Sequence, residues 1–254
     1  MIFLKTDEEI ELLRESNLIV AGALAEVGKN IKPGISTLEL DKIAETYIRD
    51  CGAVPSFLGY QGFPGSICTS VNEQVVHGIP SKYELKEGDI ISVDCGALKN
   101  GFNGDSCYTF GVGEIPYKVA ALLSSTKAAL YGAIGLAIEG QRIESLGAKI
   151  QSVVEKDGFS VVREYTGHGV GHSLHEGPAV RNYGVEGRGM KLRKGMVIAI
   201  EPMISMGKPD IYVANDGWTA ITRDGLPAAH FEHTLAVGID KADILSSFEF
   251  IENK

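Results

Sequence analysis

Cysteine, tryptophan and long apolar runs are scarce in this sequence, and each shortage excludes a class of protein. The 254 residues include 4 cysteines and 1 tryptophan, and no Cys-x-x-Cys pair occurs. This pattern excludes a disulfide scaffold, a zinc ribbon and a thioredoxin-type site. No apolar run approaches the ~20 residues of a membrane-spanning helix, and the first residues lack the layout of a signal peptide. We therefore expect a reduced, cytoplasmic protein without membrane contact.

Basic residues are outnumbered, with 24 Lys and Arg against 33 Asp and Glu, and the formal net charge is -9. This balance argues against a nucleic-acid partner. A His-Glu-x-x-His zinc motif is absent, and no Lys-Ser/Thr pair follows the glycine-rich segment 167–171, so a zincin and a phosphate-binding loop are disfavoured. The length fits one large domain or two small ones, with enough chain for a sizeable core.

Two aspartates flank the clearest turn signal in the chain, Asn100-Gly101, which predicts a β-hairpin. With a two-residue loop, Asp94 lies opposite Cys107 and Asp105 lies diagonally across on the same face. With a four-residue loop from Leu98 to Gly101, Asp94 lies directly opposite Asp105. Both registers bring two like charges together, and such a pair repels unless a cation or a shared proton lies between them. The alternative is that one aspartate caps a turn and the other is solvated.

Helix pairs alternate with strands along the chain. Capping boxes at Thr6/Glu9 and Ser36/Glu39 predict helices that end near Gly28 and Gly52. Two more helices are predicted, one from Pro116 to about Ile138 and one from Ile143 to Lys156. Predicted strands include 66–71, 160–165, 196–205, 217–221 and 231–237.

This order repeats within the chain. Lys86–Asp94 aligns with Arg193–Glu201 at an offset of 107, and Gly34 aligns with Gly140 at an offset of 106. Chance matching of glycine-ended helices and apolar strands is the alternative, but the agreement of the offsets favours an internal duplication. We predict an α+β fold of two duplicated halves, with a curved antiparallel β-sheet core inside and helix pairs outside. A cleft between the halves would receive the ends of the Asp94 and Glu201 strands.

Carboxylates and histidines supply the candidate chemistry. All six histidines lie in short polar segments, most densely in 167–176. Four carboxylates with one or more imidazoles suit Mn(II), Fe(II), Co(II) or Zn(II), and they would neutralise two divalent ions. The set therefore predicts a two-metal site with ions ~3.5–4 Å apart that generates a hydroxide nucleophile. The carboxylates are Asp94, Asp105, Glu201 and Glu232.

Over nearly the whole chain these residues resemble the type I methionine aminopeptidases, which have the pita-bread metallopeptidase fold. The matching segments are Ile67–Glu73, Val76–Pro80, Asp94-x-Gly96, Gly104-Asp105, Gly167–Gly171, His175-Glu176, Glu201–Met203, Asp216–Trp218 and Glu232–Thr234. The resemblance implies a single catalytic domain, residues 1–254, that removes the N-terminal methionine from nascent polypeptides when the second residue is small. It also implies a monomer, with the ribosome as a potential partner.

The resemblance further implies the role of each site residue. Two divalent ions (Co, Mn, Fe or Zn) would be held by Asp94, Asp105, His168, Glu201 and Glu232. A metal-bound hydroxide would attack the first peptide carbonyl, with Glu201 as proton shuttle. His175 would stabilise the oxyanion, and His77 would contact the scissile amide nitrogen or the next residue. The methionine pocket would be lined by Tyr60, Phe63, Cys68, His77 and Trp218.

Four positions depart from the family pattern and affect the expected pocket: Phe57, Leu174, Gly177 and His230. They leave the metal set unchanged. Two other functions remain open. An Xaa-Pro aminopeptidase or prolidase would use the same five ligands, usually with an extra N-terminal domain. A non-enzymatic binding module would have lost the ligands, which are intact here.

Overall fold

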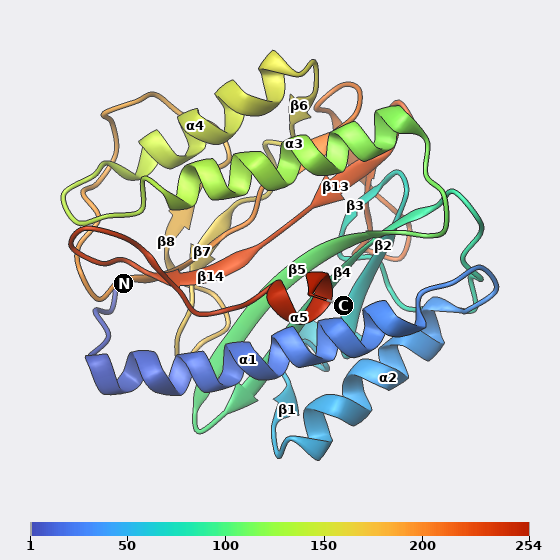
Figure 1. Ribbon diagram of the computed structural model, residues 1–254, viewed down its shortest axis with the longest axis horizontal. Helices are drawn as coiled ribbons and strands as arrows, with labels where there is room; N and C mark the ends of the chain where they lie inside the picture. Colours follow the sequence, from blue (N-terminus) through green and yellow to red (C-terminus); the bar gives the residue numbers. More distant parts are fainter. Residues whose placement is uncertain (1, 254) are drawn as a thin grey trace.

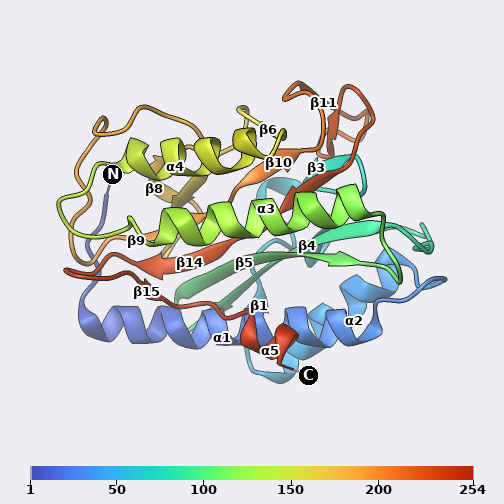
Figure 2. The same cartoon turned by 45° about the horizontal axis from the view of Figure 1, so that its top comes forward.

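Two pairs of long helices enclose the strands in the computed structural model, which describes residues 2–253. In both views of Figures 1 and 2, strands β5 and β14 run between the pair α1/α2 and the pair α3/α4. The helices are α1 (Asp7–Asn30), α2 (Thr37–Asp50), α3 (Tyr117–Ile134), α4 (Ile143–Lys156) and α5 (Glu249–Glu252), with a 3₁₀ turn, η1, at Tyr60–Gly62. No helix in residues 2–253 is both long and apolar enough to span a membrane.

The predicted helix starts are confirmed. Thr6 accepts a hydrogen bond from the Glu9 amide (3.2 Å) and donates its own amide to the Glu9 carboxylate (2.8 Å), and Ser36 with Glu39 repeats this arrangement before α2. Helix α3 begins directly after Pro116 but ends at Ile134, earlier than predicted. Gly135 follows as its C-cap, because glycine is a poor helix former.

Every ladder between the strands is antiparallel. One sheet joins β1 (Val54–Pro55), β4 (Ile90–Lys99), β2 (Ile67–Val71) and β5 (Phe102–Gly111). A five-stranded sheet has the order β15 (Asp243–Ile244), β14 (His233–Ala236), β9 (Val197–Ile200), β7 (Gly167–Gly169), β8 (Glu176–Val180). A third sheet has the order β13 (Ala228–His230), β10 (Met203–Ser205), β6 (Ser160–Val161). A fourth has the order β11 (Ile211–Val213), β12 (Ala220–Thr222), β3 (Gln74–Val76).

The two halves repeat the same hydrogen bonds, as the duplication predicts. The Gly34 amide donates to the Leu85 carbonyl (2.7 Å), and the Gly140 amide donates to the Leu192 carbonyl (2.9 Å). These two bonds are related by the offsets of 106 and 107 residues. Gly34 and Gly140 also share a left-handed backbone, with φ of 90° and 85°. The predicted α+β class with duplicated halves is therefore confirmed.

The predicted strands differ between the halves. In the first half, β4 and β5 form ten consecutive pairs around a two-residue loop, so Asp94 lies opposite Cys107 and the four-residue register is wrong. Asp94 lies in the middle of β4, not at its end. In the second half, the predicted strand 196–205 is two strands, β9 and β10, because Pro202 offers no N–H to continue the ladder. The predicted strand 160–165 shortens to β6.

Candidate active site

A cavity of about 330 Å³ lies where the two halves meet, and it contains every site residue predicted from the sequence. These residues are Tyr60, Phe63, Cys68, His77, Asp94, Asp105, His168, His175, Glu201, Trp218 and Glu232. They come from loops and strands up to 172 positions apart in the chain. The fold therefore brings together the whole predicted set.

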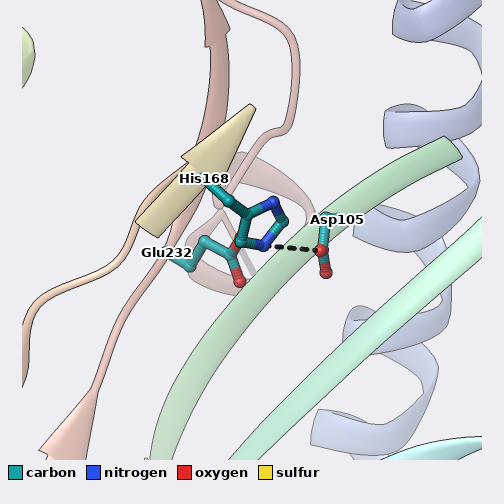
Figure 3. A group of neighbouring side chains, drawn as sticks. All are labelled: Asp105, His168 and Glu232. Atoms are coloured by element: carbon teal, nitrogen blue, oxygen red, sulfur yellow. Dashed lines mark ion pairs between the residues drawn. The ribbon is translucent and has the colours of Figure 1, made fainter. Parts of the chain in front are cut away.

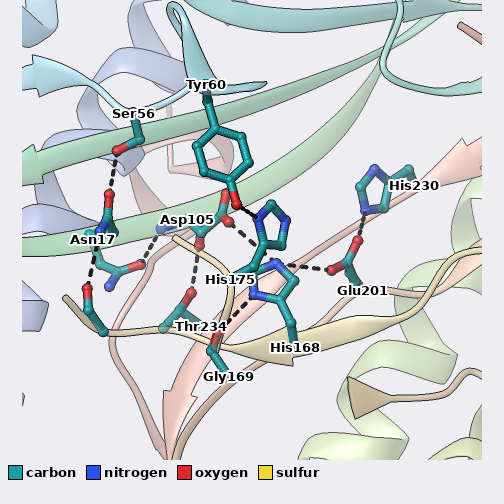
Figure 4. A network of polar contacts seen from close by, with 12 residues as sticks. Asn17, Ser56, Tyr60, Asp105, His168, Gly169, His175, Glu201, His230 and Thr234 are labelled. Atoms are coloured by element: carbon teal, nitrogen blue, oxygen red, sulfur yellow. Dashed lines mark hydrogen bonds and ion pairs between the residues drawn. The ribbon is translucent and has the colours of Figure 1, made fainter. Parts of the chain in front are cut away.

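Hydrogen bonds between the halves hold two of the carboxylates side by side. The Thr234 hydroxyl donates to the Asp105 carbonyl (2.8 Å), and the Ser106 hydroxyl donates to the Glu232 carbonyl (2.7 Å). From helix α1, the Asn17 side-chain oxygen accepts the Asp105 amide (3.2 Å; Figure 4). These contacts fix the backbone at both residues. Asp105 and Glu232 thus project from neighbouring segments of different halves.

His168 points its ring at these carboxylates (Figure 3). Its Nε2 lies 3.6 Å from an Asp105 oxygen and 3.4 Å from a Glu201 oxygen. Its Nδ1 lies 2.9 Å from the Gly169 carbonyl, which can only accept, so Nδ1 carries the proton and Nε2 keeps its lone pair. Burial lowers the pKa of His168 to about 3, which keeps the ring neutral. One ligand atom each of Asp105, His168 and Glu232 lie within 4.8 Å of one another.

The carboxylates of the cavity lack counter-charges. One buried oxygen each of Asp94, Asp105 and Glu232 has no hydrogen-bond partner. Among the described residues, no Lys or Arg lines the cavity. Burial raises the pKa of Asp94 to about 7, and it raises the pKa of Asp105, Glu201 and Glu232 well above the ordinary range. Buried, unpaired oxygens beside a neutral imidazole are the donor set that divalent cations require, so these residues fit a metal.

Two further histidines face the same space. The His175 Nδ1 and the Tyr60 hydroxyl share a hydrogen bond of 2.9 Å, and the His175 ring centroid lies 4.2 Å from that of His168. His77 follows β3 with a left-handed backbone (φ 60°), which is uncommon for a residue with a side chain. Its ring meets Tyr165 edge-on at 5.1 Å. Burial lowers the pKa of His77 to about 4, and it also lowers that of His175.

An apolar wall closes one side of the cavity. Its buried members are Phe57, Phe63, Cys68 and Leu174, with Tyr60, Ile79 and Trp218 packed against them. Phe63 and Trp218 meet edge to face at 5.1 Å. A Cβ added to Gly96 would lie 2.6 Å from the Phe57 ring, so the absence of a side chain at 96 makes room for this aromatic. Two of the four departures, Phe57 and Leu174, therefore belong to the wall.

His230, which the sequence analysis named only as a departure from the family pattern, lies in the site and contacts a predicted ligand. Its ring is buried, and its Nε2 lies 3.3 Å from the second oxygen of Glu201 (Figure 4). Tyr165 also lines the cavity. The spacing of two between His230 and Glu232 is a signal for His230, because alternate residues of an extended segment share a face. Tyr165 lies in no pattern that distinguishes it.

The remaining histidines stabilise the fold outside the cavity. His172 Nδ1 lies 2.8 Å from the Gly101 carbonyl, and its ring packs on Phe102 with centroids 4.1 Å apart. His233 Nδ1 lies 2.6 Å from the Ser246 hydroxyl, and its ring stacks on Phe248 at 3.8 Å. Neither is needed to explain the chemistry of the cavity.

Comparison with known proteins agrees with this geometry. A sequence model of metallopeptidase family M24 matches residues 11–238, and the chain belongs to this family. It is 50% identical to methionine aminopeptidase 1 of Bacillus subtilis over 246 residues, which cover 97% of this chain and 99% of that protein. A crystal structure of methionine aminopeptidase from Thermotoga maritima has a TM-score of 0.96 at 44% identity, covering 97% of this chain and 100% of that one. The predicted resemblance and the pita-bread fold are confirmed.

A second activity occurs on the same fold. The prolidase from Pyrococcus furiosus has a TM-score of 0.77 at 25% identity, covering 96% of this chain and 65% of that one. The fold and the family therefore define a metallopeptidase but leave the substrate to be argued from the cavity.

Proposed function

We propose that this chain is a dinuclear-metal aminopeptidase that removes the N-terminal methionine from nascent polypeptides. The observation that carries the proposal is the cluster of buried carboxylate oxygens without partners, which adjoins an apolar wall. Relatives named methionine aminopeptidase support the substrate. We further propose that residues 1–254 act as one catalytic domain and a monomer in the cytoplasm, with the ribosome as a candidate partner.

Five residues would hold two divalent cations, Co(II), Mn(II), Fe(II) or Zn(II). They are Asp94, Asp105, His168, Glu201 and Glu232. The unpaired oxygens of Asp94, Asp105 and Glu232 and the free Nε2 of His168 support this assignment. Bound cations of this kind lower the pKa of water enough to supply a hydroxide nucleophile near neutral pH.

Polar groups around the scissile peptide would transfer the proton and stabilise the oxyanion. Glu201 would accept the proton of the attacking water and pass it to the leaving amine, because its carboxylate lies within the cluster, 3.4 Å from the Nε2 of His168. His175 would donate a hydrogen bond from its Nε2 to the developing oxyanion. In this role the Tyr60 hydroxyl donates to Nδ1, which leaves the proton of the neutral ring on Nε2 and orients the ring. His77 would contact the scissile amide or the following residue.

The apolar wall would bind the methionine side chain. A thioether packs well against aromatic rings and a thiol, and the wall offers Phe63, Trp218 and Cys68. His77 and the glycine-rich segment 167–171 would leave little space beyond the scissile bond. We therefore expect small second residues, such as Gly, Ala and Ser, to be preferred.

A paired peptide assay tests the proposal. Chelator-treated protein should be inactive and should regain activity with Mn(II), Co(II) or Fe(II), releasing methionine from Met-Ala-Ser. Ala-Pro peptides should be cleaved poorly, and Met-Lys peptides more slowly than Met-Ala. Full activity without metal, or a preference for Ala-Pro substrates, would overturn it; the second result would favour the Xaa-Pro peptidase alternative that the prolidase fold leaves open.

Point variants separate the roles of His175 and Glu201. His175→Ala should lower kcat by ~10²–10³, the usual cost of losing one oxyanion donor, while the metal content stays full. Glu201→Gln should lose activity and metal together. Metal-depleted His175→Ala protein would instead make His175 a ligand. The metal content measured by plasma mass spectrometry distinguishes the two results.

A further inference from the structure

The segment before α1 contacts the second half of the molecule through Lys5. The Lys5 amide donates to the Gly195 carbonyl (2.7 Å), immediately before the capping box at Thr6. A Cβ on Gly195 would lie 2.8 Å from the Lys5 carbonyl oxygen, so the two backbones touch. The backbone of Lys5 is therefore fixed against Gly195.

The Lys5 side chain enters the protein and forms a buried ion pair. Its Nζ lies 2.8 Å from a Glu176 carboxylate oxygen, and the two side chains are 3% and 7% exposed. The other Glu176 oxygen accepts the Ser173 amide (3.2 Å). A Cβ on Gly171 would overlap both partners of the pair, so this glycine lets the chain close around them. Both carboxylate oxygens are thus used.

The loop closed by this pair carries His175. Its first residues are fixed to the hairpin, because the Asn103 amide donates to the Gly171 carbonyl (2.9 Å) and the Asn103 side chain donates to the His172 carbonyl (3.0 Å). Its last residue, Glu176, pairs with Gly169, the neighbour of His168. The Lys5–Glu176 pair therefore closes the end of the loop that lies next to the His175 ring.

We propose that Lys5 is a positioning residue of the active site, which acts through Glu176 to hold the His175 ring. This inference rests on the oxyanion role proposed for His175. Removal of one partner would leave the other charge buried and unpaired, and the loop would have to move to bring water to it. A displacement of ~1 Å at a catalytic group can cost about 10²-fold in rate. The N-terminal segment thus belongs to the catalytic unit.

Lys5→Met in the full-length, metal-loaded protein tests the inference. We expect kcat to fall by about 10²-fold with KM little changed and metal content full. Glu176→Gln should act in the same direction. The double variant Lys5→Met/Glu176→Gln should recover part of kcat, since neither buried charge remains. If a single variant fails to fold, the double variant is measured in its place. The matched control is Lys194→Met, because the Lys194–Asp7 pair is 3.8 Å long with side chains 54% and 84% exposed, and it should leave kcat unchanged.

A cycle with His175→Ala distinguishes positioning from general destabilisation. If Lys5 acts through His175, Lys5→Met should have little further effect on kcat in the His175→Ala background. An equal loss in both backgrounds would overturn the inference. Hydrogen exchange supplies a readout that is independent of activity: the Ser173 amide should exchange faster in Lys5→Met and not in Lys194→Met.

The same experiments separate this inference from the proposed function. If His175→Ala keeps full kcat, His175 does not stabilise the oxyanion. Faster exchange of the Ser173 amide in Lys5→Met would then still support the control of the loop by Lys5. If His175→Ala is impaired while Lys5→Met matches Lys194→Met in kcat and in exchange, the inference is wrong and the proposed function stands.

Discussion

The two halves of the molecule share a hydrogen-bonding plan but hold their carboxylates in different ways. In the first half, Asp94 and Asp105 lie on one uninterrupted hairpin, whose register alone places them close together. In the second half, Glu201 follows β9 at a break caused by Pro202, and Glu232 lies between β13 and β14. The first pair is therefore brought together by one hairpin. In the second pair, Glu232 depends on the other half, because its amide donates to the Cys107 carbonyl and its carbonyl accepts the Ser106 hydroxyl. The Glu201 carbonyl instead accepts a hydrogen bond from Asn182 of its own half.

The largest effect should come from removing a carboxylate of either half. Asp105→Asn and Glu232→Gln each replace a buried oxygen that lacks a partner. Both should lose metal and lower kcat/KM by more than the ~10²–10³ expected for one oxyanion donor. Metal analysis and peptide hydrolysis give the two readouts. If Asp105→Asn is impaired and Glu232→Gln is not, the second half does not contribute to the site as described.

Removing the hydrogen bond between helix α1 and the Asp105 backbone should weaken metal binding less than removing a carboxylate does. Asn17 accepts the Asp105 amide and donates to the Leu13 carbonyl. Asn17→Ala should therefore weaken metal binding by about 10–100-fold, the range for residues that orient a ligand. Asn30→Ala is the matched control, because Asn30 makes the same type of bond, to the Glu26 carbonyl, far from the cavity. Equal metal affinities for the two variants would contradict the role of Asn17.

The pH dependence of stability in the metal-free protein should show a still smaller effect, through the buried Asp94 carboxyl. Burial raises the pKa of Asp94 to about 7 from an ordinary value of 3.8, so the folded state keeps a proton that the unfolded state has lost. This group therefore reduces the free energy of unfolding as the pH rises from about 4 to 7. Compared with Asp94→Asn, the metal-free wild type should lose more stability across that interval. Parallel slopes of melting temperature against pH would contradict this account.

Equivalent glycines of the two halves should show the smallest difference. Gly88 and Gly195 have φ of 87° and 85°, and an alanine costs roughly 1–2 kcal/mol in the left-handed region. Gly195→Ala should cost more than Gly88→Ala, because its Cβ would lie 2.8 Å from the Lys5 carbonyl oxygen, whereas the Gly88 Cβ would have no neighbour closer than 3.7 Å. Urea unfolding measures both. A larger loss in Gly88→Ala would be inconsistent with the close approach at Lys5.

The sequence predicted best what depends on neighbours in the chain. The capping boxes and the Asn100-Gly101 hairpin follow from local side-chain chemistry, and they lie where they were expected. The resemblance to a known family supplied the set of cavity residues, which the fold brings together. Periodicity alone would have left the partners of Asp94 unknown.

The features that the sequence did not predict depend on distant contacts. The contact of His230 with Glu201 joins two segments, and the Lys5–Glu176 pair joins residues 171 positions apart. No spacing rule relates such residues, and a lysine near the N-terminus is ordinarily a solvated surface residue. The break at Pro202 was readable from the missing N–H, but the apolar run on both sides favoured a single strand.

The proposed function requires carboxylates from both halves to hold two cations in one site. Anomalous X-ray diffraction from crystals of Mn(II)-loaded protein, collected at the manganese absorption edge, tests it most directly. We expect two anomalous peaks in the cavity, with Asp94 and Asp105 from the first half and His168, Glu201 and Glu232 from the second half around them. A single peak, or peaks that contact the carboxylates of only one half, would contradict it.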